Sequence, residues 1–157
     1  MQSVDISHIA EHVGEEVKLE GWVYNKRSSG SLVFLIVRDG TGFIQAVAVK
    51  GEIPDEDFQK CDELTQESSI VVSGKVKADK RAPGGYELAV TGVRPVHLAE
   101  EYPISLKKHG VDFLMDWRHL WLRTPRQAAV LKIRHEIIGA IRDFLDEREF
   151  VLVDAPI

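Results

Sequence analysis

Residues 21–49, GWVYNKRSSGSLVFLIVRDGTGFIQAVAV, predict three consecutive β-strands joined by short turns. Successive side chains of a strand point to opposite faces, so the second strand (32–38) and the third (43–49) can each be divided into two faces. One face of each strand is wholly apolar and is expected to line a core: Val33, Leu35, Val37, Ile44, Ala46 and Ala48. The opposite faces are then expected to point outward, and they carry Phe34, Arg38 and Gln45.

Those outward faces combine an aromatic ring with an amide and a guanidinium. This combination is typical of a surface on which nucleic-acid bases stack. The segment 26–30 (KRSSG) is interpreted as a tight basic loop at one edge of this surface. A core position for Phe34 fits the alternation equally well, because its strand is apolar almost throughout.

The composition restricts the kinds of binding that the chain can use. Of its 157 residues 44% are hydrophobic and 29% are charged, as in ordinary globular proteins, and the net charge is −5. A net negative charge argues against nucleic-acid binding by bulk electrostatics, so any such binding must rest on a local patch and on base contacts. The sequence has no apolar run of membrane-spanning length, and its single cysteine, Cys61, cannot form an internal disulfide. Both features predict a cytoplasmic protein that does not bind membranes.

The remaining elements surround the three central strands. A short helix is predicted over 5–14, and a first strand over 17–26, in which Gly21 suggests a bulge. Because a bulge reverses the alternation, the direction of Arg27 stays open. His8 and His12 lie one helical turn apart, but with no third ligand in sight we interpret them as surface residues and predict no metal site.

A second helix and two more strands complete the predicted barrel. The helix spans 56–64 and the strands span 69–78 and 86–93, with Lys80 and Arg81 at the turn between the strands. Five strands with a helix between the third and the fourth match the order of an OB-fold barrel. In that fold the ligand lies over the second and third strands, flanked by the two loops that are basic here. The fold class is therefore mainly β, with short helices.

The pattern changes after the barrel, which we assign to residues 1–97. Residues 98–125 are interpreted as a linker, and Thr124 and Pro125 predict the start of a long amphipathic helix. Residues 150–156 are expected to form a strand. One helix and one strand do not complete a domain, so the region 126–157 looks cut short, unless it packs on the barrel or pairs with a second subunit.

Several segments together resemble the amino-terminal part of bacterial asparaginyl-tRNA synthetases, a class IIb family, over essentially the whole chain. They include GWVYNKRSSG, FLIVRDGTGFIQ, GYELAVTGV, YPISLKKHG and FLMDWRHLWLR. FVLVDAPI looks like the strand of class II motif 1, which ends at Pro156 and contributes to the dimer interface in that family. The resemblance implies that 126–157 begins an α/β catalytic domain and that the protein is a homodimer.

The resemblance also implies a role for the barrel. In class IIb enzymes an aromatic residue stacks on the central uridine of the tRNA anticodon, a glutamine reads its edge and an arginine contacts the anticodon. Arg27, Phe34 and Gln45 match this pattern. Further RNA contacts are expected from Lys26, Lys80 and Arg81, and from Glu87, which falls near a base-reading carboxylate of the aspartyl enzymes.

The family joins asparagine to tRNA through an aminoacyl-adenylate, with ATP and magnesium. Its adenylate-forming motifs are expected beyond Ile157, so these residues are expected to bind tRNA, to contain no catalytic residue and to need no cofactor of their own. Three alternatives remain open: the anticodon-binding part of an aspartyl- or lysyl-tRNA synthetase, a stand-alone OB-fold protein that binds generic single strands, and a dimerisation module.

Overall fold

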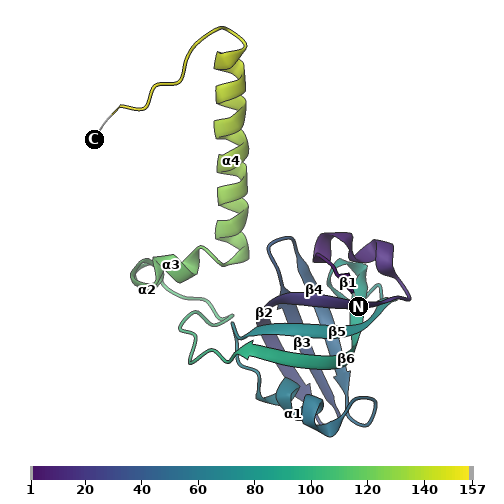
Figure 1. The fold of residues 1–157 in the computed structure, drawn as a ribbon. Coiled ribbons are helices and arrows are strands. Elements are labelled where there is room, and N and C mark those ends of the chain that lie inside the picture. The colour runs from purple at the N-terminus through teal and green to yellow at the C-terminus, as the bar shows by residue number, and fades with distance from the viewer. Residues whose placement is uncertain (1, 156–157) are drawn as a thin grey trace. The chain divides into compact units, whose positions relative to one another are not determined.

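The computed structural model describes residues 2–155. The chain divides into two compact units, the first ending at Tyr102 and the second beginning at Pro103. The first unit is a barrel built from one continuous sheet (Figure 1). Its strands are β1 (Gln2–Ser3), β2 (Glu16–Ser29), β3 (Leu32–Arg38), β4 (Phe43–Val49), β5 (Ser69–Ala78) and β6 (Tyr86–His97). They follow the order β1-β2-β3-β4-β6-β5, and β2 also pairs with β5, which closes the barrel.

The pairing is that of an OB-fold. β4 and β6 are parallel, whereas β2–β3, β3–β4, β5–β6 and β2–β5 are antiparallel. Helix α1 (Asp55–Glu63) connects β4 to β5 and buries Phe58 and Cys61 in the core. The predicted five strands with a helix between the third and the fourth are confirmed.

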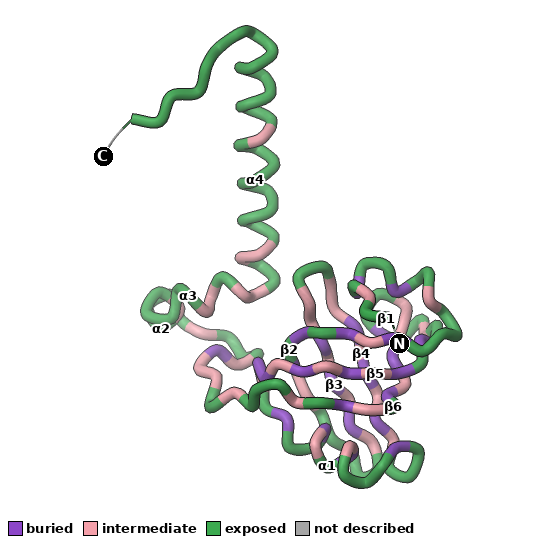
Figure 2. Tube along the Cα trace, viewed as in Figure 1, coloured by how far each residue is buried: buried purple, intermediate pink, exposed green. Residues whose placement is uncertain are grey.

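The core follows the alternation read from the sequence. All six apolar residues predicted to point inward from β3 and β4 are at most 1% exposed, and the outward residues between them are partly exposed. Figure 2 shows this alternation as buried and intermediate segments that follow one another along the strands. Phe34 is therefore on the outer face, as the base-stacking interpretation requires.

Strand β2 contains the predicted bulge, but at a different residue. Its pairing with β3 shifts between Val23 and Asn25, which places the bulge at Tyr24 rather than at Gly21. Gly21 has a packing role instead, because a Cβ atom there would lie 2.4 Å from the carbonyl oxygen of Arg38.

The basic segment 26–30 is not a loop, contrary to the sequence interpretation. Lys26 to Ser29 continue strand β2, and Ser29 still pairs with Leu32. The turn consists only of Gly30 and Ser31, and Gly30 has a φ of +58°. Glycine adopts this left-handed conformation at low cost, and a two-residue turn therefore leaves the preceding cations inside the strand.

The predicted helix near the amino terminus is a 3₁₀ helix, η1 (Ile6–His12). The side chain of Asp5 does not cap it. The backbone N–H of Ile6 instead donates to Asp39 Oδ2 at 2.8 Å, and that of Ser7 donates to Thr41 Oγ1 at 3.0 Å. These bonds attach η1 to the turn between β3 and β4.

The second unit is helical. It contains α2 (Val111–Asp116), α3 (Arg118–Trp121) and α4 (Pro125–Asp146), so two short helices lie within the predicted linker and the long helix begins at Pro125 as expected. The strand predicted over 150–156 is wrong for the described part: residues 150–155 are not in a strand. A strand needs a neighbour that pairs with it, and the structure pairs these residues with none. Pro156 lies outside the described residues.

Among the described residues, no helix is both long enough and apolar enough to cross a lipid bilayer.

Candidate nucleic-acid interface

Two cross-strand rows of residues build the outer face of β2, β3, β4 and β6. In the first row Arg27 pairs with Phe34, and Phe34 pairs with Val47. In the second row Ile36 pairs with Gln45, and Gln45 pairs with Glu87. Paired residues project to the same side of a sheet. The register therefore brings Arg27, Phe34, Gln45 and Glu87, which are far apart in sequence, onto one surface.

Arg27 and Phe34 are in direct contact on this surface. The guanidinium Cζ of Arg27 lies 5.2 Å from the centroid of the Phe34 ring, within the range of a cation–π interaction. Arg27 is exposed and Phe34 is partly exposed. The sequence did not determine the direction of the Arg27 side chain, because of the bulge in β2. The contact shows that Arg27 points to the same side of the sheet as Phe34. Together they form a partly exposed surface that carries an aromatic ring and a positive charge.

Gln45 and Glu87 lie side by side on neighbouring parallel strands. Both are partly exposed. An amide presents one acceptor and two donors, whereas an ionised carboxylate presents acceptors only. The pair can therefore distinguish bases by the pattern of donors and acceptors on their edges.

Lys26 is not part of this surface. It pairs with Leu35, which points into the core, and its ammonium donates to the backbone carbonyl of Asp62 near the end of α1. The hydroxyl of Ser28 donates to Asp62 Oδ1 at 2.6 Å. The alternate residues Lys26 and Ser28 thus attach β2 to the α1 end, while Arg27 between them faces outward.

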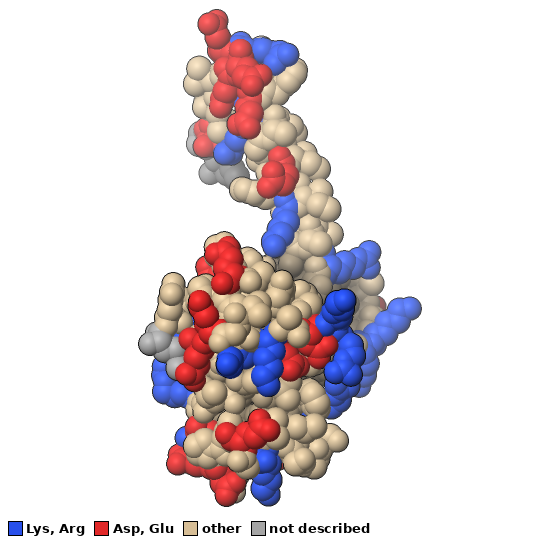
Figure 3. All heavy atoms as spheres, turned by 90° about the vertical axis from the view of Figure 1, so that its right-hand side faces the viewer, with Lys and Arg blue, Asp and Glu red and all other residues tan. Residues whose placement is uncertain are grey.

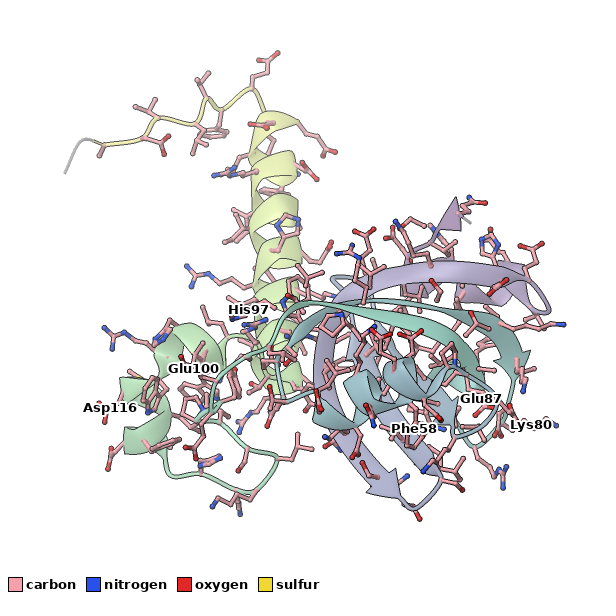
Figure 4. All side chains as sticks on the ribbon, turned by 60° about the horizontal axis from the view of Figure 1, so that its bottom comes forward. Phe58, Lys80, Glu87, His97, Glu100 and Asp116 are labelled. Carbon is pink, nitrogen blue, oxygen red and sulfur yellow. The ribbon has the colours of Figure 1, made fainter. Side chains whose placement is uncertain are left out.

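The turn between β5 and β6 holds one cation by a local ion pair. Asp79 accepts hydrogen bonds from the backbone N–H of Arg81 at 2.9 Å and from its guanidinium at 3.4 Å. These bonds, with the Arg81 charge, lower the pKa of Asp79. The side-chain hydrogen bonds to Asp79 and its negative charge raise the pKa of Arg81. Lys80 is exposed. Figure 4 shows Lys80 and Glu87 at the same end of the barrel.

A second aromatic contact on the outer face was missed by the sequence reasoning. The rings of Tyr24 and Phe43 meet edge to face, with centroids 5.0 Å apart and an angle of 73° between the ring planes. Phe43 shares the face of Gln45 by simple alternation, so it could have been predicted. Tyr24 could not, because it is the bulged residue.

Arg38 lies on the outer face, as predicted, but its guanidinium is engaged by protein groups. Its Nη2 lies 2.7 Å from Glu67 Oε2, with both side chains largely buried, and its Cζ lies 6.0 Å from the centroid of the Tyr24 ring. It is therefore a structural cation rather than one that is available to a phosphate.

Charges of both signs occur around the barrel. On the face drawn in Figure 3, Lys and Arg are interspersed with Asp and Glu, and no uninterrupted basic stripe crosses the view. This distribution agrees with the net charge of −5 and favours recognition through particular contacts rather than a broad electrostatic attraction.

Comparison with known families shows to which family the barrel belongs. Residues 17–96 match the family model described as the OB-fold nucleic acid binding domain. The chain belongs to this family. Residues 110–157 match a second model, described as class II tRNA synthetases (D, K and N).

The similarity extends to complete proteins. The chain is 60% identical over 157 residues to the asparagine–tRNA ligase of Desulforamulus reducens, covering 100% of this chain and 36% of the relative. It is 54% identical over 155 residues to an asparagine–tRNA ligase of Thermus thermophilus, covering 98% of this chain and 35% of the relative. The resemblance of this OB-fold chain to asparaginyl-tRNA synthetases is thereby confirmed. The chain spans about a third of the length of these relatives.

Solved structures show the same fold. The asparaginyl-tRNA synthetase of Pyrococcus horikoshii, in complex with asparaginyl-adenylate, has a TM-score of 0.90 and 38% identity over 98% of this chain and 36% of that one. An aspartyl-tRNA synthetase of Entamoeba histolytica has a TM-score of 0.84 and 26% identity over 98% of this chain and 39% of that one.

Proposed function

We propose that this chain recognises the anticodon of tRNA, within an asparagine–tRNA ligase, through the outer face of its OB-fold barrel. The observation that carries the proposal is the pair of cross-strand rows that brings Arg27, Phe34, Gln45 and Glu87 onto one surface. Membership of a nucleic-acid-binding family and whole-chain similarity to asparagine–tRNA ligases support it.

In this proposal Phe34 stacks on the central uridine of the anticodon, and Arg27, whose guanidinium contacts the Phe34 ring, contacts the anticodon beside it. Stacking tolerates any base, so discrimination requires hydrogen bonds. The Gln45 amide can accept from the N3–H of uracil and donate to its O4. Cytosine has an unprotonated N3 and a donor amine in these places, so it presents the opposite pattern. Glu87, beside Gln45, reads a donor on a neighbouring base.

The outer cations have supporting roles in the proposal. Lys80 and Arg81 lie in the turn before strand β6, Lys80 lies at the same end of the barrel as Glu87, and both cations can neutralise phosphates of the bound loop. Lys26 is assigned a smaller part than the sequence suggested, because its ammonium is held by the Asp62 carbonyl.

The ligase activity is proposed for the whole protein from its relatives. It would join asparagine to tRNA with ATP and magnesium, in the cytoplasm, as a homodimer formed through the segment that ends at Pro156. Within residues 2–155 no group of three or more His, Cys, Asp and Glu side chains is placed to hold a metal ion.

The other interpretations are less well supported. An aspartyl enzyme shares the fold at 26% identity, whereas the asparagine–tRNA ligases of Desulforamulus reducens and Thermus thermophilus are 60% and 54% identical to this chain. A generic single-strand binder would lack the second segment, 110–157, which matches class II synthetases.

The test is binding of the chain to an anticodon stem-loop that carries GUU, beside the same loop with the central uridine changed to cytidine. Wild type is expected to bind the first loop more tightly, and Gln45→Ala is expected to bind both alike. The matched control is Gln59→Ala, which removes an exposed amide from helix α1. Equal binding of both loops by wild type would refute the base-reading role.

A further inference from the structure

Strand β2 changes its neighbours along its length. Its first half, Glu16 to Trp22, pairs with β5, and that pairing ends at Trp22. Residues 25–29, which follow the bulge and include Arg27, pair with β3. In the part of the chain that the structure describes, no strand pairs along their other side. An edge segment lacks one of the two neighbours that hold an interior strand, so its position depends on other contacts.

Asp62, near the end of helix α1, supplies such contacts. The hydroxyl of Ser28 donates to Asp62 Oδ1 at 2.6 Å, and the ammonium of Lys26 donates to the backbone carbonyl of Asp62. Arg27, between these two residues, points to the opposite side, where its guanidinium contacts the Phe34 ring. One residue of α1 therefore holds the β2 edge immediately before and immediately after Arg27.

An aspartate at this place is unfavourable for the helix itself. Helix α1 spans Asp55–Glu63, so Asp62 is its next-to-last residue. The carboxyl end of a helix carries a partial negative charge, which disfavours an acidic side chain there, and aspartate is also a weak helix former. Local helix preference therefore does not account for Asp62, whereas its contacts with β2 do.

We propose that Asp62 is a positioning residue for RNA binding and that it acts through Arg27. The inference rests on the proposed function, because it needs an RNA loop on the surface that carries Arg27 and Phe34. In this role Asp62 holds the β2 edge, so that the guanidinium lies beside the Phe34 ring before the RNA arrives. An arginine on an edge that nothing holds must be ordered during binding, and that ordering costs affinity.

The sign of the effect separates this role from simple electrostatics. An acidic side chain repels the phosphates of RNA, so removal of its charge alone should tighten binding. Asp62→Ala removes the charge together with the acceptor for Ser28. It is expected to bind the GUU stem-loop roughly 2- to 10-fold more weakly, the cost of ordering one flexible side chain. Asp62→Asn keeps a side-chain oxygen that can accept from Ser28, so it should bind at least as tightly as wild type.

Glu63→Ala is the matched control. It removes the same charge from the next residue of α1, which is also exposed, and it leaves the acceptor on Asp62 in place. Its affinity should equal that of wild type or be slightly higher. Ser28→Ala removes the donor and should reproduce the loss in Asp62→Ala. Thermal unfolding compares the folding of all variants, and Asp62→Ala should keep the wild-type Tm, because alanine is the best helix former.

A double variant tests whether the effect passes through Arg27. Arg27→Gln with Asp62→Ala should bind no more weakly than Arg27→Gln alone, whereas a general loosening of the barrel would add its own loss. Each protein is also titrated with the loop in which the central uridine is cytidine. The preference for uridine, which the proposed function assigns to Gln45, should be the same in Asp62→Ala as in wild type.

The inference is overturned if Asp62→Ala binds the GUU loop as tightly as Glu63→Ala does, if Asp62→Asn loses as much affinity as Asp62→Ala, or if the loss is undiminished beside Arg27→Gln. Each of these results leaves the proposed function standing when wild type still prefers the uridine loop. A wild type that binds both loops alike would refute the base reading, and a loss in Asp62→Ala that depends on Arg27 would still establish the positioning role. Absence of RNA binding by wild type would overturn both.

Discussion

The guanidinium of Arg27 lies over the ring of Phe34, with Cζ 5.2 Å from the ring centroid, across paired positions of β2 and β3. The contact exists without RNA, so the cation and the ring are already placed relative to each other before a ligand arrives. Preorganisation of this kind lowers the cost of ordering side chains on binding. The two residues are therefore expected to act together.

Loss of the Phe34 ring should weaken RNA binding, because the base then has no ring on which to stack. Phe34→Ala and Phe34→Leu are both expected to lower affinity for the GUU stem-loop by about 1–3 kcal/mol, whereas Phe34→Tyr, which keeps a ring, should stay near wild type. Leucine retains the apolar character of the site, so the leucine variant separates stacking from simple burial. Fluorescence titration at a fixed salt concentration measures the effect.

The control residue for this prediction must lie away from the surface that carries Phe34, Gln45 and Glu87. Lys77 would be a poor choice, because it pairs with Glu87 on the neighbouring strand. Lys18, which forms an ion pair with Glu20, is a better choice. If Lys18→Ala reduced affinity as much as Phe34→Ala, the stacking role would have to be abandoned.

Arg27 should contribute to RNA binding through its positive charge as well as through stacking of its planar guanidinium. Arg27→Gln is expected to reduce the slope of log K against log[salt] by about 0.7, the contribution of one phosphate contact to a single strand. Arg27→Lys should preserve the slope but lose part of the affinity, since an ammonium cannot stack as a guanidinium does. The measurement is a series of titrations over salt concentration. An unchanged slope in Arg27→Gln would show that Arg27 does not contact a phosphate.

The alternation in residues 32–49 separated the two faces correctly, because β3 and β4 pair without interruption, but it left a core position open for Phe34 until the structure was known. It failed in β2, where the bulge at Tyr24 depends on backbone hydrogen bonds between Val23 and the distant residues Glu67 and Ser68. No local pattern reveals such a contact, so the directions of Tyr24, Lys26 and Arg27 required the structure. The strand expected over 150–156 is absent from the described residues 150–155 for a related reason: strand formation depends on a partner, not on β propensity alone.

The ion pair of Arg38 with Glu67 should be important for stability. The side chains are only 12% and 5% exposed, so Glu67→Ala would leave a largely buried guanidinium without this carboxylate. We expect a loss of about 3–5 kcal/mol in the free energy of unfolding, measured by urea denaturation. The double variant Arg38→Ala, Glu67→Ala should lose less than the sum of the two single variants.

Glu20→Ala is the matched control for this cycle. It breaks the surface pair of Glu20 with Lys18, and the denaturation midpoint is expected to stay nearly unchanged. Strict additivity of the two single variants would mean that Arg38 and Glu67 do not stabilise each other.

Asp39 should make the stability of the barrel depend on pH. Burial alone would raise the pKa of its carboxyl, but hydrogen bonds from the N–H of Ile6, from the Thr41 hydroxyl and N–H, and from the N–H of Gly42 outweigh burial and lower it. A group whose pKa is lower in the folded state stabilises the fold above its unfolded pKa of about 3.9. That stabilisation is lost as the pH falls through the folded value. Asp39→Asn should therefore be less stable than wild type by about 1–2 kcal/mol at pH 7, and the difference should shrink below about pH 4.

Urea denaturation of both proteins from pH 7 to pH 3 measures this difference. Asp5→Asn is the control, because the Asp5 side chain lies at the start of the same helix and makes no capping hydrogen bond. Its difference from wild type should stay small at every pH. A gap between wild type and Asp39→Asn that remained constant down to pH 3 would contradict the assignment, because an ionised carboxylate that binds η1 must lose its advantage when it is protonated.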